Sequence, residues 1–151
     1  RQSARAVIPT IITQVAAGQR QIRLGALSPT RDFNYVADTC AAFQAIAACD
    51  AALGQVVNAA SNFEISIGDT AALIAEVMNV ELEIVTDEQR MRPEGSEVNR
   101  LFGDNSLLKE LTGRQPDYGG LDGFRRGLAN TAEWFSDPAN LARYRPGTYA
   151  V

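Results

Sequence analysis

The feature of this sequence that most restricts its fold is a set of strand-like segments that are all short. Each combines apolar and polar residues as β-strands do, none exceeds five residues, and helical patterns separate them. The segments are Gln21–Leu24, Asp32–Tyr35, Gln55–Asn58, Glu64–Ser66 and Glu81–Val85. The sequence therefore predicts an α/β fold of mixed helices and short strands.

One of these segments raises a question about the sheet that it would join. Val56 and Val57 are apolar at consecutive positions, as in a strand that is buried on both faces. No long hydrophobic segment elsewhere in the chain could be its neighbour in a sizeable parallel sheet. Two explanations stay open: the strand predictions are poor, or the partner strands are absent from this chain.

Local signals predict five helices. Gly18 and Gly113 end two of them, Asp104 caps one, and Ser66–Asp69 has the form of a capping box. The predicted helices cover Ala6–Val15, Val36–Cys49, a segment that begins after Ser66, Asn105–Leu111, and a long final segment from Leu121.

Apolar residues recur at helical spacing in three of these helices. The second helix carries Val36, Cys40, Phe43 and Ala47, and the third carries Leu73, Ile74, Val77 and Met78. The last carries Leu121, Phe124, Leu128, Ala132 and Phe135, with Trp134 beside that stripe. We expect the aromatic residues of the last helix, Trp134 included, to lie in the core.

Composition narrows the chemistry that these residues can perform. The 151 residues contain no histidine, which excludes Ser-His-Asp and Cys-His nucleophile pairs, imidazole acid–base catalysis and histidine-containing metal sites. A net charge of −4 argues against binding nucleic acid through bulk electrostatics. All basic side chains except Lys109 are arginines. This bias is typical of a GC-rich genome, and it equally suits anion capture by guanidinium groups.

The cysteines and the apolar runs bear on the compartment. Cys40 and Cys49 lie on opposite faces of one predicted helix, about 13 Å apart along its axis, and so cannot form a disulfide with each other. Two unpaired thiols suit a reducing cytoplasm. No apolar run approaches the roughly 18 residues that span a membrane, and the N-terminus does not resemble a signal peptide. We expect a cytoplasmic protein.

Three stretches, in matching order and spacing, resemble the C-terminal half of the extended short-chain dehydrogenase/reductases. The first is Thr30–Asp38, which looks like the motif Arg-Asp-aromatic-x-Tyr-Val-x-Asp, and the second is Val57–Asn58 followed by Glu64–Ile67. The third runs from Arg92–Val98 through Asp104–Ser106 and Leu111–Gly113 to Gly123–Gly127 and Glu133–Phe135. The closest likeness is to 4,6-dehydratases that act on GDP- or UDP-linked hexoses or N-acetylhexosamines, and 4-epimerases are next.

The resemblance implies an NAD(P)-dependent parent enzyme, a lyase with a Rossmann-type sheet and a Tyr-x-x-x-Lys catalytic pair. This chain has neither that pair nor the Gly-x-x-Gly-x-x-Gly cofactor turn. We therefore expect residues 1–151 to be a nucleotide-sugar-binding C-terminal domain without the N-terminal NAD-binding domain. Alone, such a truncated chain would bind no NAD or NADP and no metal, and it would have no catalytic residues.

The resemblance also implies which residues hold the substrate. Arg31 and Arg92 match arginines that contact the nucleoside diphosphate, and Glu97 matches an acidic residue on the ribose hydroxyls. The loop Leu24–Pro29, beginning with Leu24, resembles the wall against which the base packs, and Arg5 lies near the first sugar or phosphate contacts. For three of these residues an ordinary structural role stays open. Arg31 would form an ion pair with Asp32, Arg92 would have a structural role in its loop, and Glu97 would be a solvated acid.

The resemblance therefore predicts the substrate-binding portion of a nucleotide-sugar 4,6-dehydratase. Two alternatives stay open, a 4-epimerase fragment and a non-catalytic binding or interaction module that self-associates through the face meant for the missing domain. The expected partner is a GDP- or UDP-linked sugar, with no nucleic acid or membrane. The chain departs from the family at Arg114, where a tryptophan is common, and at Asn58–Ser61, where an Asn-x-Gly turn is usual.

Overall fold

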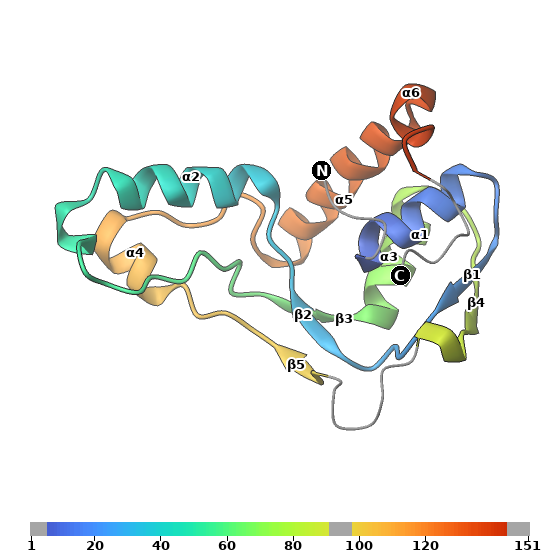
Figure 1. Cartoon of the computed structure of the whole chain (residues 1–151), viewed down its shortest axis with the longest axis horizontal. Helices are drawn as coiled ribbons and strands as arrows, with labels where there is room; N and C mark the ends of the chain where they lie inside the picture. Colours follow the sequence, from blue (N-terminus) through green and yellow to red (C-terminus); the bar gives the residue numbers. More distant parts are fainter. Residues whose placement is uncertain (1–5, 91–97, 145–151) are drawn as a thin grey trace. The chain divides into compact units, whose positions relative to one another are not determined.

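The structure is a computed structural model that describes residues 6–90 and 98–144. Contacts along the chain divide it into two compact units. Unit 1 comprises Arg1–Pro29, Ser66–Asn99 and Leu128–Val151, and unit 2 comprises Thr30–Ile65 and Arg100–Gly127. The order of the elements follows the colours of Figure 1 from blue to red. The expected mixture of helices with short strands is confirmed.

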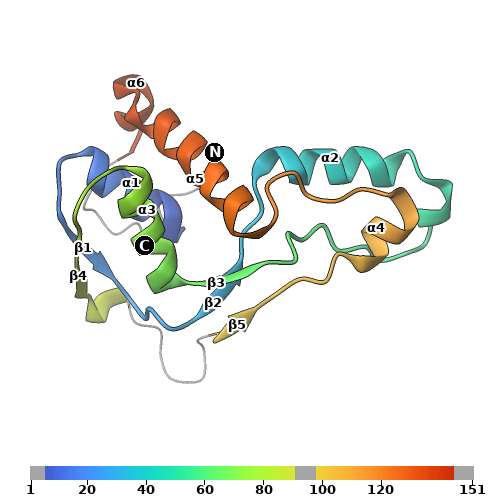
Figure 2. The same cartoon turned by 180° about the vertical axis from the view of Figure 1, so that it is seen from behind.

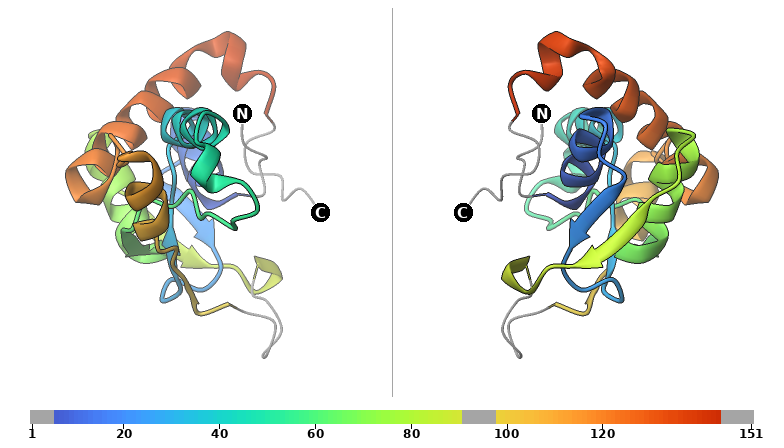
Figure 3. Two further views of the ribbon diagram at one scale, coloured as in Figure 1. Left: turned by 90° about the vertical axis from the view of Figure 1, so that its left-hand side faces the viewer. Right: turned by 90° about the vertical axis from the view of Figure 1, so that its right-hand side faces the viewer.

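Unit 1 is built on one pair of parallel strands. β1 (Gln21–Leu24) pairs with β4 (Glu83–Thr86), in a register that joins Gln21 to Glu83 and Leu24 to Thr86. Helix α1 (Val7–Ala16) packs beside β1 and beside α3 (Ile67–Val77), as Figure 3 shows from two sides. The core of this unit contains isoleucines that are at most 1% exposed: Ile11, Ile12, Ile22 and Ile74.

The start of α3 confirms Ser66 as the N-cap of the predicted helix, but the Asp69 carboxylate meets the Ser66 hydroxyl rather than its backbone N–H as in a full capping box. The Ser66 hydroxyl accepts a hydrogen bond from the Asp69 N–H at 2.9 Å and donates one to the Asp69 carboxylate at 2.6 Å. These bonds satisfy one of the backbone donors that a helix leaves unpaired at its first turn. Leu73 and Ile74 of the predicted stripe are buried, whereas Val77 and Met78 are half-buried at the helix end.

Unit 2 contains a three-stranded sheet and the helices α2 (Val36–Ala47) and α4 (Ser106–Thr112), which lie side by side in Figures 1 and 2. The strand order is β3 (Glu64–Ser66), β2 (Thr30–Asp32), β5 (Arg100–Leu101). β2 and β5 are parallel, with Thr30 opposite Arg100 and Arg31 opposite Leu101. β5 was not predicted from the sequence, because two residues are too few to show alternation.

Helix α2 forms where predicted, but its apolar stripe faces outward. Val36 is 62% exposed and Phe43 65% exposed, and Cys40 and Ala47 are exposed as well. The buried residues of α2 are Asp38 and Ala42, on the other side of the helix. The helical spacing of the apolar residues thus identified the helix, but it did not show which face of the helix is buried.

The predicted strand Gln55–Asn58 is wrong for this chain. After the 3₁₀ turn η1 (Asp50–Ala52), the segment is extended but belongs to neither sheet. Val56 is 90% exposed rather than buried on both faces. An apolar extended segment forms a strand only when neighbouring strands satisfy its backbone groups, and the described residues supply none here.

The C-terminal helices follow the local signals, with two corrections to the expected core. Gly113 ends α4 at φ 70°, a left-handed conformation that glycine adopts without strain. In α5 (Gly120–Ser136), Leu121 is 50% exposed and Trp134 is 38% exposed. Leu121 lies in the first turn, and Trp134 meets Phe135 and Tyr144 edge-on at the rim of unit 1. A short helix, α6 (Pro138–Leu141), follows.

Among the residues that the structure describes, no helix is both long and apolar enough to cross a membrane.

Candidate nucleotide-sugar site

The sheet of unit 2 carries Arg31 on its middle strand, and Glu64 and Arg100 form an ion pair on the same sheet. Thr30 donates a hydrogen bond to the Glu64 carboxylate at 2.8 Å, and Arg100 binds that carboxylate through Nε and Nη2 at 2.6–3.1 Å. One side chain from each strand thus meets at Glu64. Since successive residues of a strand point to opposite faces, Arg31 projects from the face opposite this cluster.

The cluster at Glu64 makes a pH-dependent prediction. Hydrogen bonds from Arg100, and then from Thr30, lower the pKa of the Glu64 carboxyl below its ordinary value of 4.5. A carboxyl with a depressed pKa contributes stability above its unfolded-state pKa and loses it as the pH falls through the folded-state pKa. We expect NMR titration to give Glu64 a midpoint below 4.5 and Arg100→Gln to raise it. An unchanged midpoint in that variant would mean that the ion pair does not form in solution.

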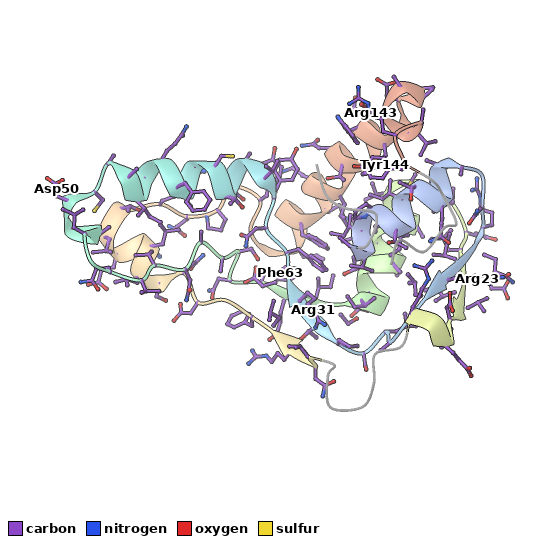
Figure 4. All side chains as sticks on the ribbon, in the orientation of Figure 1. Arg23, Arg31, Asp50, Phe63, Arg143 and Tyr144 are labelled. Carbon is purple, nitrogen blue, oxygen red and sulfur yellow. The ribbon has the colours of Figure 1, made fainter. Side chains whose placement is uncertain are left out.

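Arg31 is the one sequence-predicted arginine of the site among the described residues. Its guanidinium Nη1 donates to the backbone oxygen of Thr30 at 2.8 Å, and the side chain is half-buried. Figure 4 labels it beside the strands of unit 2. A guanidinium held against a strand in this way is pre-organised to bind an anion through charge-assisted hydrogen bonds.

Asp32 has a structural role that does not require an arginine. Its Oδ1 accepts hydrogen bonds from the Ser61 N–H and hydroxyl at 3.0 and 2.6 Å. Its Oδ2 accepts from the N–H groups of Asn62 and Gly103 at 3.1 and 3.3 Å. These four donors satisfy the carboxylate and join β2 to the segment at Ser61 and Asn62 and to Gly103.

Leu24 ends strand β1 in unit 1, and its side chain is only 3% exposed. The loop that follows is anchored through its backbone, because Leu27 and Pro29 accept hydrogen bonds from the N–H groups of Gly68 and Ile67 at 3.0 Å. A β-carbon at Gly25 would meet the carbonyl of Arg90 at 2.5 Å, so the chains approach closely there. Any contact of Leu24–Pro29 with a nucleobase would therefore use a loop of fixed shape that begins at the buried Leu24 side chain.

Arg5, Arg92 and Glu97, the other three sequence-predicted site residues, lie outside the described residues.

The departure at Arg114 has a structural explanation. Nη2 of Arg114 lies 3.5 Å from Oδ1 of the buried Asp38 and 2.8 Å from Oδ2 of Asp117. Asp38 also accepts the N–H groups of Asp117 and Tyr118 at 2.8 and 2.9 Å. Where the family usually places an aromatic residue, this chain therefore joins α2 to the loop 114–118 through an ion pair, although Nε of Arg114 is buried without a hydrogen-bond partner.

The turn after Asn58 also differs from the expected Asn-x-Gly form. The carbonyls of Ala59 and Ala60 accept hydrogen bonds from the side-chain amides of Asn34 and Asn105 at 3.1 and 3.0 Å. The left-handed residue comes later, at Asn62, with φ 57°. Asparagine tolerates this conformation better than most residues, so no glycine is needed.

A polar hollow of about 670 Å³ on unit 2 was not predicted from the sequence. Its lining comes from three separate segments: Ser61, Asn62, Asn105, Ser106, Lys109, Glu110, Gln115, Pro116, Gly119 and Gly120. The only advance signal was that Lys109 is the sole lysine. Arg31 and Leu24, the two sequence-predicted site residues that the structure describes, do not line this hollow. Among the described residues, no group of three Cys, Asp or Glu side chains could hold a metal ion.

Comparison with known proteins places this architecture among enzymes of nucleotide-sugar metabolism. The family described as GDP-mannose 4,6 dehydratase matches residues 1–126. The GDP-6-deoxy-D-mannose reductase of Pseudomonas aeruginosa is 34% identical over 97 residues, which are 64% of this chain and 31% of the reductase.

Two solved structures show the same likeness. The Bordetella bronchiseptica enzyme WbmF, in complex with NADH, is 33% identical with a TM-score of 0.69, over 92% of this chain and 38% of WbmF. A UDP-N-acetylglucosamine 4-epimerase from Methanobrevibacter ruminantium, in complex with UDP-N-acetylmuramic acid, is 26% identical with a TM-score of 0.71, over 89% of this chain and 42% of the epimerase.

The chain thus spans about a third of the curated reductase and about two fifths of the solved enzymes. The family match nevertheless covers most of this chain, from the first residue into α5. The chain belongs to the GDP-mannose 4,6-dehydratase family, within the extended short-chain dehydrogenase/reductases that include nucleotide-sugar dehydratases and epimerases.

Proposed function

We propose that this chain is the substrate-binding portion of an NAD(P)-dependent nucleotide-sugar 4,6-dehydratase and that it binds the nucleoside diphosphate of the sugar nucleotide. The observation that supports this most directly is the family match over residues 1–126, which includes every residue assigned to the substrate. The similar P. aeruginosa protein is a GDP-6-deoxy-D-mannose reductase, which favours a GDP-linked sugar.

In this proposal Arg31 and Arg92 clamp the diphosphate. Two guanidinium groups from separate segments can each give paired, charge-assisted hydrogen bonds to phosphate oxygens. Arg31 has the support of its position on the paired strand β2, where its guanidinium donates to the Thr30 backbone oxygen. Clamping the nucleotide, which does not react, is how such enzymes hold the hexose in reacting geometry.

The remaining assignments complete the proposed nucleotide site. The loop Leu24–Pro29 forms a wall for the base, Glu97 accepts hydrogen bonds from the ribose hydroxyls, and Arg5 contacts the sugar or a phosphate. The backbone anchors of the loop to α3 support the first of these, because a rigid wall loses little conformational entropy on binding.

The residues present do not fit a dinucleotide. The 151 residues lack both a Gly-x-x-Gly-x-x-Gly turn and a Tyr-x-x-x-Lys pair, so we derive no catalytic step for this chain. We propose that it binds no NAD or NADP by itself and that the parent enzyme supplies hydride transfer from a separate domain. A 4-epimerase fragment is the second candidate, favoured by the likeness to the UDP-N-acetylglucosamine 4-epimerase.

Isothermal titration of the purified chain with GDP and UDP tests the proposed site. We expect Arg31→Ala to weaken nucleotide binding about 10- to 100-fold, since a hydrogen bond to a charged group contributes roughly 1.5–3 kcal/mol. Arg31→Lys keeps the charge but not the fork and should recover only part of the affinity. Arg23→Ala, at an exposed arginine on β1, is the matched control. Equal affinities for the wild type and Arg31→Ala would refute the role of Arg31.

A further inference from the structure

The polar hollow on unit 2 has a volume of about 670 Å³ and is bounded by three walls, all from that unit. The first wall is Ser61 and Asn62, the second is residues 105–110 at the start of α4, and the third is the segment 115–120 that leads into α5. Ligand pockets in proteins typically measure roughly 300–1,000 Å³. The hollow therefore has the size of a site for a small molecule.

Contacts within unit 2 hold all three walls in place. In the first wall, Ser61 donates its N–H and its hydroxyl to the Asp32 carboxylate at 3.0 and 2.6 Å. In the second, the side-chain amide of Asn105 donates to a carbonyl just before the first wall at 3.0 Å. In the third, two backbone N–H groups bind the buried Asp38 at 2.8 and 2.9 Å. A ligand would thus meet walls of fixed shape, and little conformational entropy would be lost on binding.

Four polar side chains line the hollow and keep their hydrogen-bonding groups available. Asn62, Lys109, Glu110 and Gln115 come from all three walls and are exposed. Within the described part of the chain, none of these four side chains makes a hydrogen bond or an ion pair. Together they offer one ammonium donor, one carboxylate acceptor and two amides that both donate and accept.

This lining disfavours several classes of ligand. No aromatic or large aliphatic side chain is among the residues around the hollow, so an apolar molecule or a stacked base would find no matching surface. Lys109 and Glu110 supply one positive and one negative charge, so no excess of positive charge attracts a polyanion. A neutral, polar ligand fits these conditions best.

A small zwitterion, such as a free amino acid, fits less well than a ring that carries hydroxyl groups. Lys109 and Glu110 are consecutive on α4, so their side chains point about 100° apart. The two charges of an amino acid flank a single carbon and could not meet both side chains. Hydroxyl groups around a ring point in several directions, and each one both donates and accepts, as the amides of Asn62 and Gln115 do.

We propose that this hollow binds a neutral saccharide of one or two rings through Asn62, Lys109, Glu110 and Gln115. The Lys109 ammonium donates to hydroxyl oxygens, and the Glu110 carboxylate accepts from hydroxyl groups on another side of the ring. The two amides, on the first and third walls, bind the hydroxyl groups between them. This inference does not depend on nucleotide binding by Arg31, which does not line the hollow.

Lys109 provides a specific probe for the test, because it is the only lysine of the chain. Reductive methylation with ¹³C-formaldehyde labels Lys109 and the N-terminal amine, and methylation keeps the positive charge. The purified chain is titrated with glucose, mannose and maltose, and NMR follows the Lys109 methyl signal and, in a ¹⁵N-labelled sample, the backbone amides. We expect a saccharide to shift the Lys109 signal and the amides of the three walls, with saturation in the millimolar range.

Two substitutions locate the bound saccharide. Gln115→Ala and Asn62→Gly each remove one amide and should weaken binding by about 3- to 10-fold, the effect of one neutral hydrogen bond. Glycine tolerates the φ of 57° at Asn62, so the turn should keep its shape. Gln44→Ala, at an exposed glutamine of α2 that does not line the hollow, is the matched control and should leave the affinity unchanged.

Three outcomes would overturn the proposal. The first is that no saccharide of the panel shifts the amides of the walls at tens of millimolar. The second is that free glutamate or inorganic phosphate shifts them at lower concentrations than any saccharide does, which would make this a site for a charged ligand. The third is that Gln115→Ala and Asn62→Gly bind the saccharide as tightly as Gln44→Ala does. GDP is titrated separately, so a failure of nucleotide binding bears on Arg31 and not on the hollow.

Discussion

Replacing Asp38 with alanine is expected to destabilise the chain by about 3–5 kcal/mol, the largest effect of any single polar substitution in unit 2. Asp38 is 6% exposed, and it accepts the N–H groups of Asp117 and Tyr118 while it faces Arg114. Its removal leaves two backbone donors and a partly buried guanidinium without their acceptor, and breaking a buried ion pair from one side typically costs this much. Urea unfolding followed by circular dichroism measures the loss.

Two further variants make the Asp38 result specific. Asp38→Asn keeps one carbonyl oxygen and the shape of the side chain, so we expect roughly half of the loss. Asp122→Ala, at an exposed aspartate in the first turn of α5, should change stability by less than about 0.5 kcal/mol. If Asp38→Ala were as mild as Asp122→Ala, the loop 114–118 would not be held by α2.

Replacing Asp32 with alanine is expected to destabilise the chain by about 2–4 kcal/mol and to weaken nucleotide binding as well. The carboxylate joins β2 to the segment at Ser61 and Asn62 and to Gly103 beyond β5. Each buried donor that loses its acceptor costs about 1–3 kcal/mol, and partial exposure puts this site toward the lower values. Since Asp32 follows Arg31 on the same strand, a looser strand should also misplace the guanidinium.

Urea unfolding and GDP titration of the same Asp32→Ala protein separate these two effects. Ser61→Ala is the matched variant, because it removes the hydroxyl, which donates to Asp32 and accepts the Phe63 N–H, but keeps the backbone donors to Asp32. It should cost about 1 kcal/mol. A stable Asp32→Ala protein with unchanged GDP affinity would show that the four hydrogen bonds do not organise the strand that carries Arg31.

The sequence was informative where a structure depends on a few neighbouring residues. The N-cap at Ser66 and the glycine that ends α4 at Gly113 act within one helical turn, and both are found as predicted. The same holds for the short strand Gln21–Leu24, whose alternation survives in the burial of Ile22 and Leu24. Such signals do not depend on what the rest of the molecule does.

The sequence failed where burial depends on distant partners. The apolar pattern of Gln55–Asn58 predicted a strand, but strand formation needs neighbours that the described residues do not supply. The apolar residues of α2, among them Val36 and Phe43, likewise identified a helix without revealing that this face is exposed. β5 and the polar hollow near Lys109 arise from segments far apart in the chain, so no local pattern could reveal them.

In the candidate site, too, the sequence revealed some features and missed others. The motif Thr30–Asp38 correctly drew attention to β2 and to the start of α2, but the roles of its two aspartates, Asp32 and Asp38, were visible only from their hydrogen bonds. The proposed substrate roles of Arg31 and Leu24 remain predictions. So do those of Arg5, Arg92 and Glu97, which lie outside the described residues.

The central claim is that this chain holds a nucleoside diphosphate through Arg31. Titration of the ¹⁵N-labelled chain with GDP, followed by ¹H–¹⁵N correlation spectra, tests it most directly. The proposal predicts that the largest shift changes fall on the backbone amides of residues 30–32 and on the Arg31 side chain. Shift changes centred on the hollow around Asn62 and Lys109, or no changes at millimolar GDP, would contradict it.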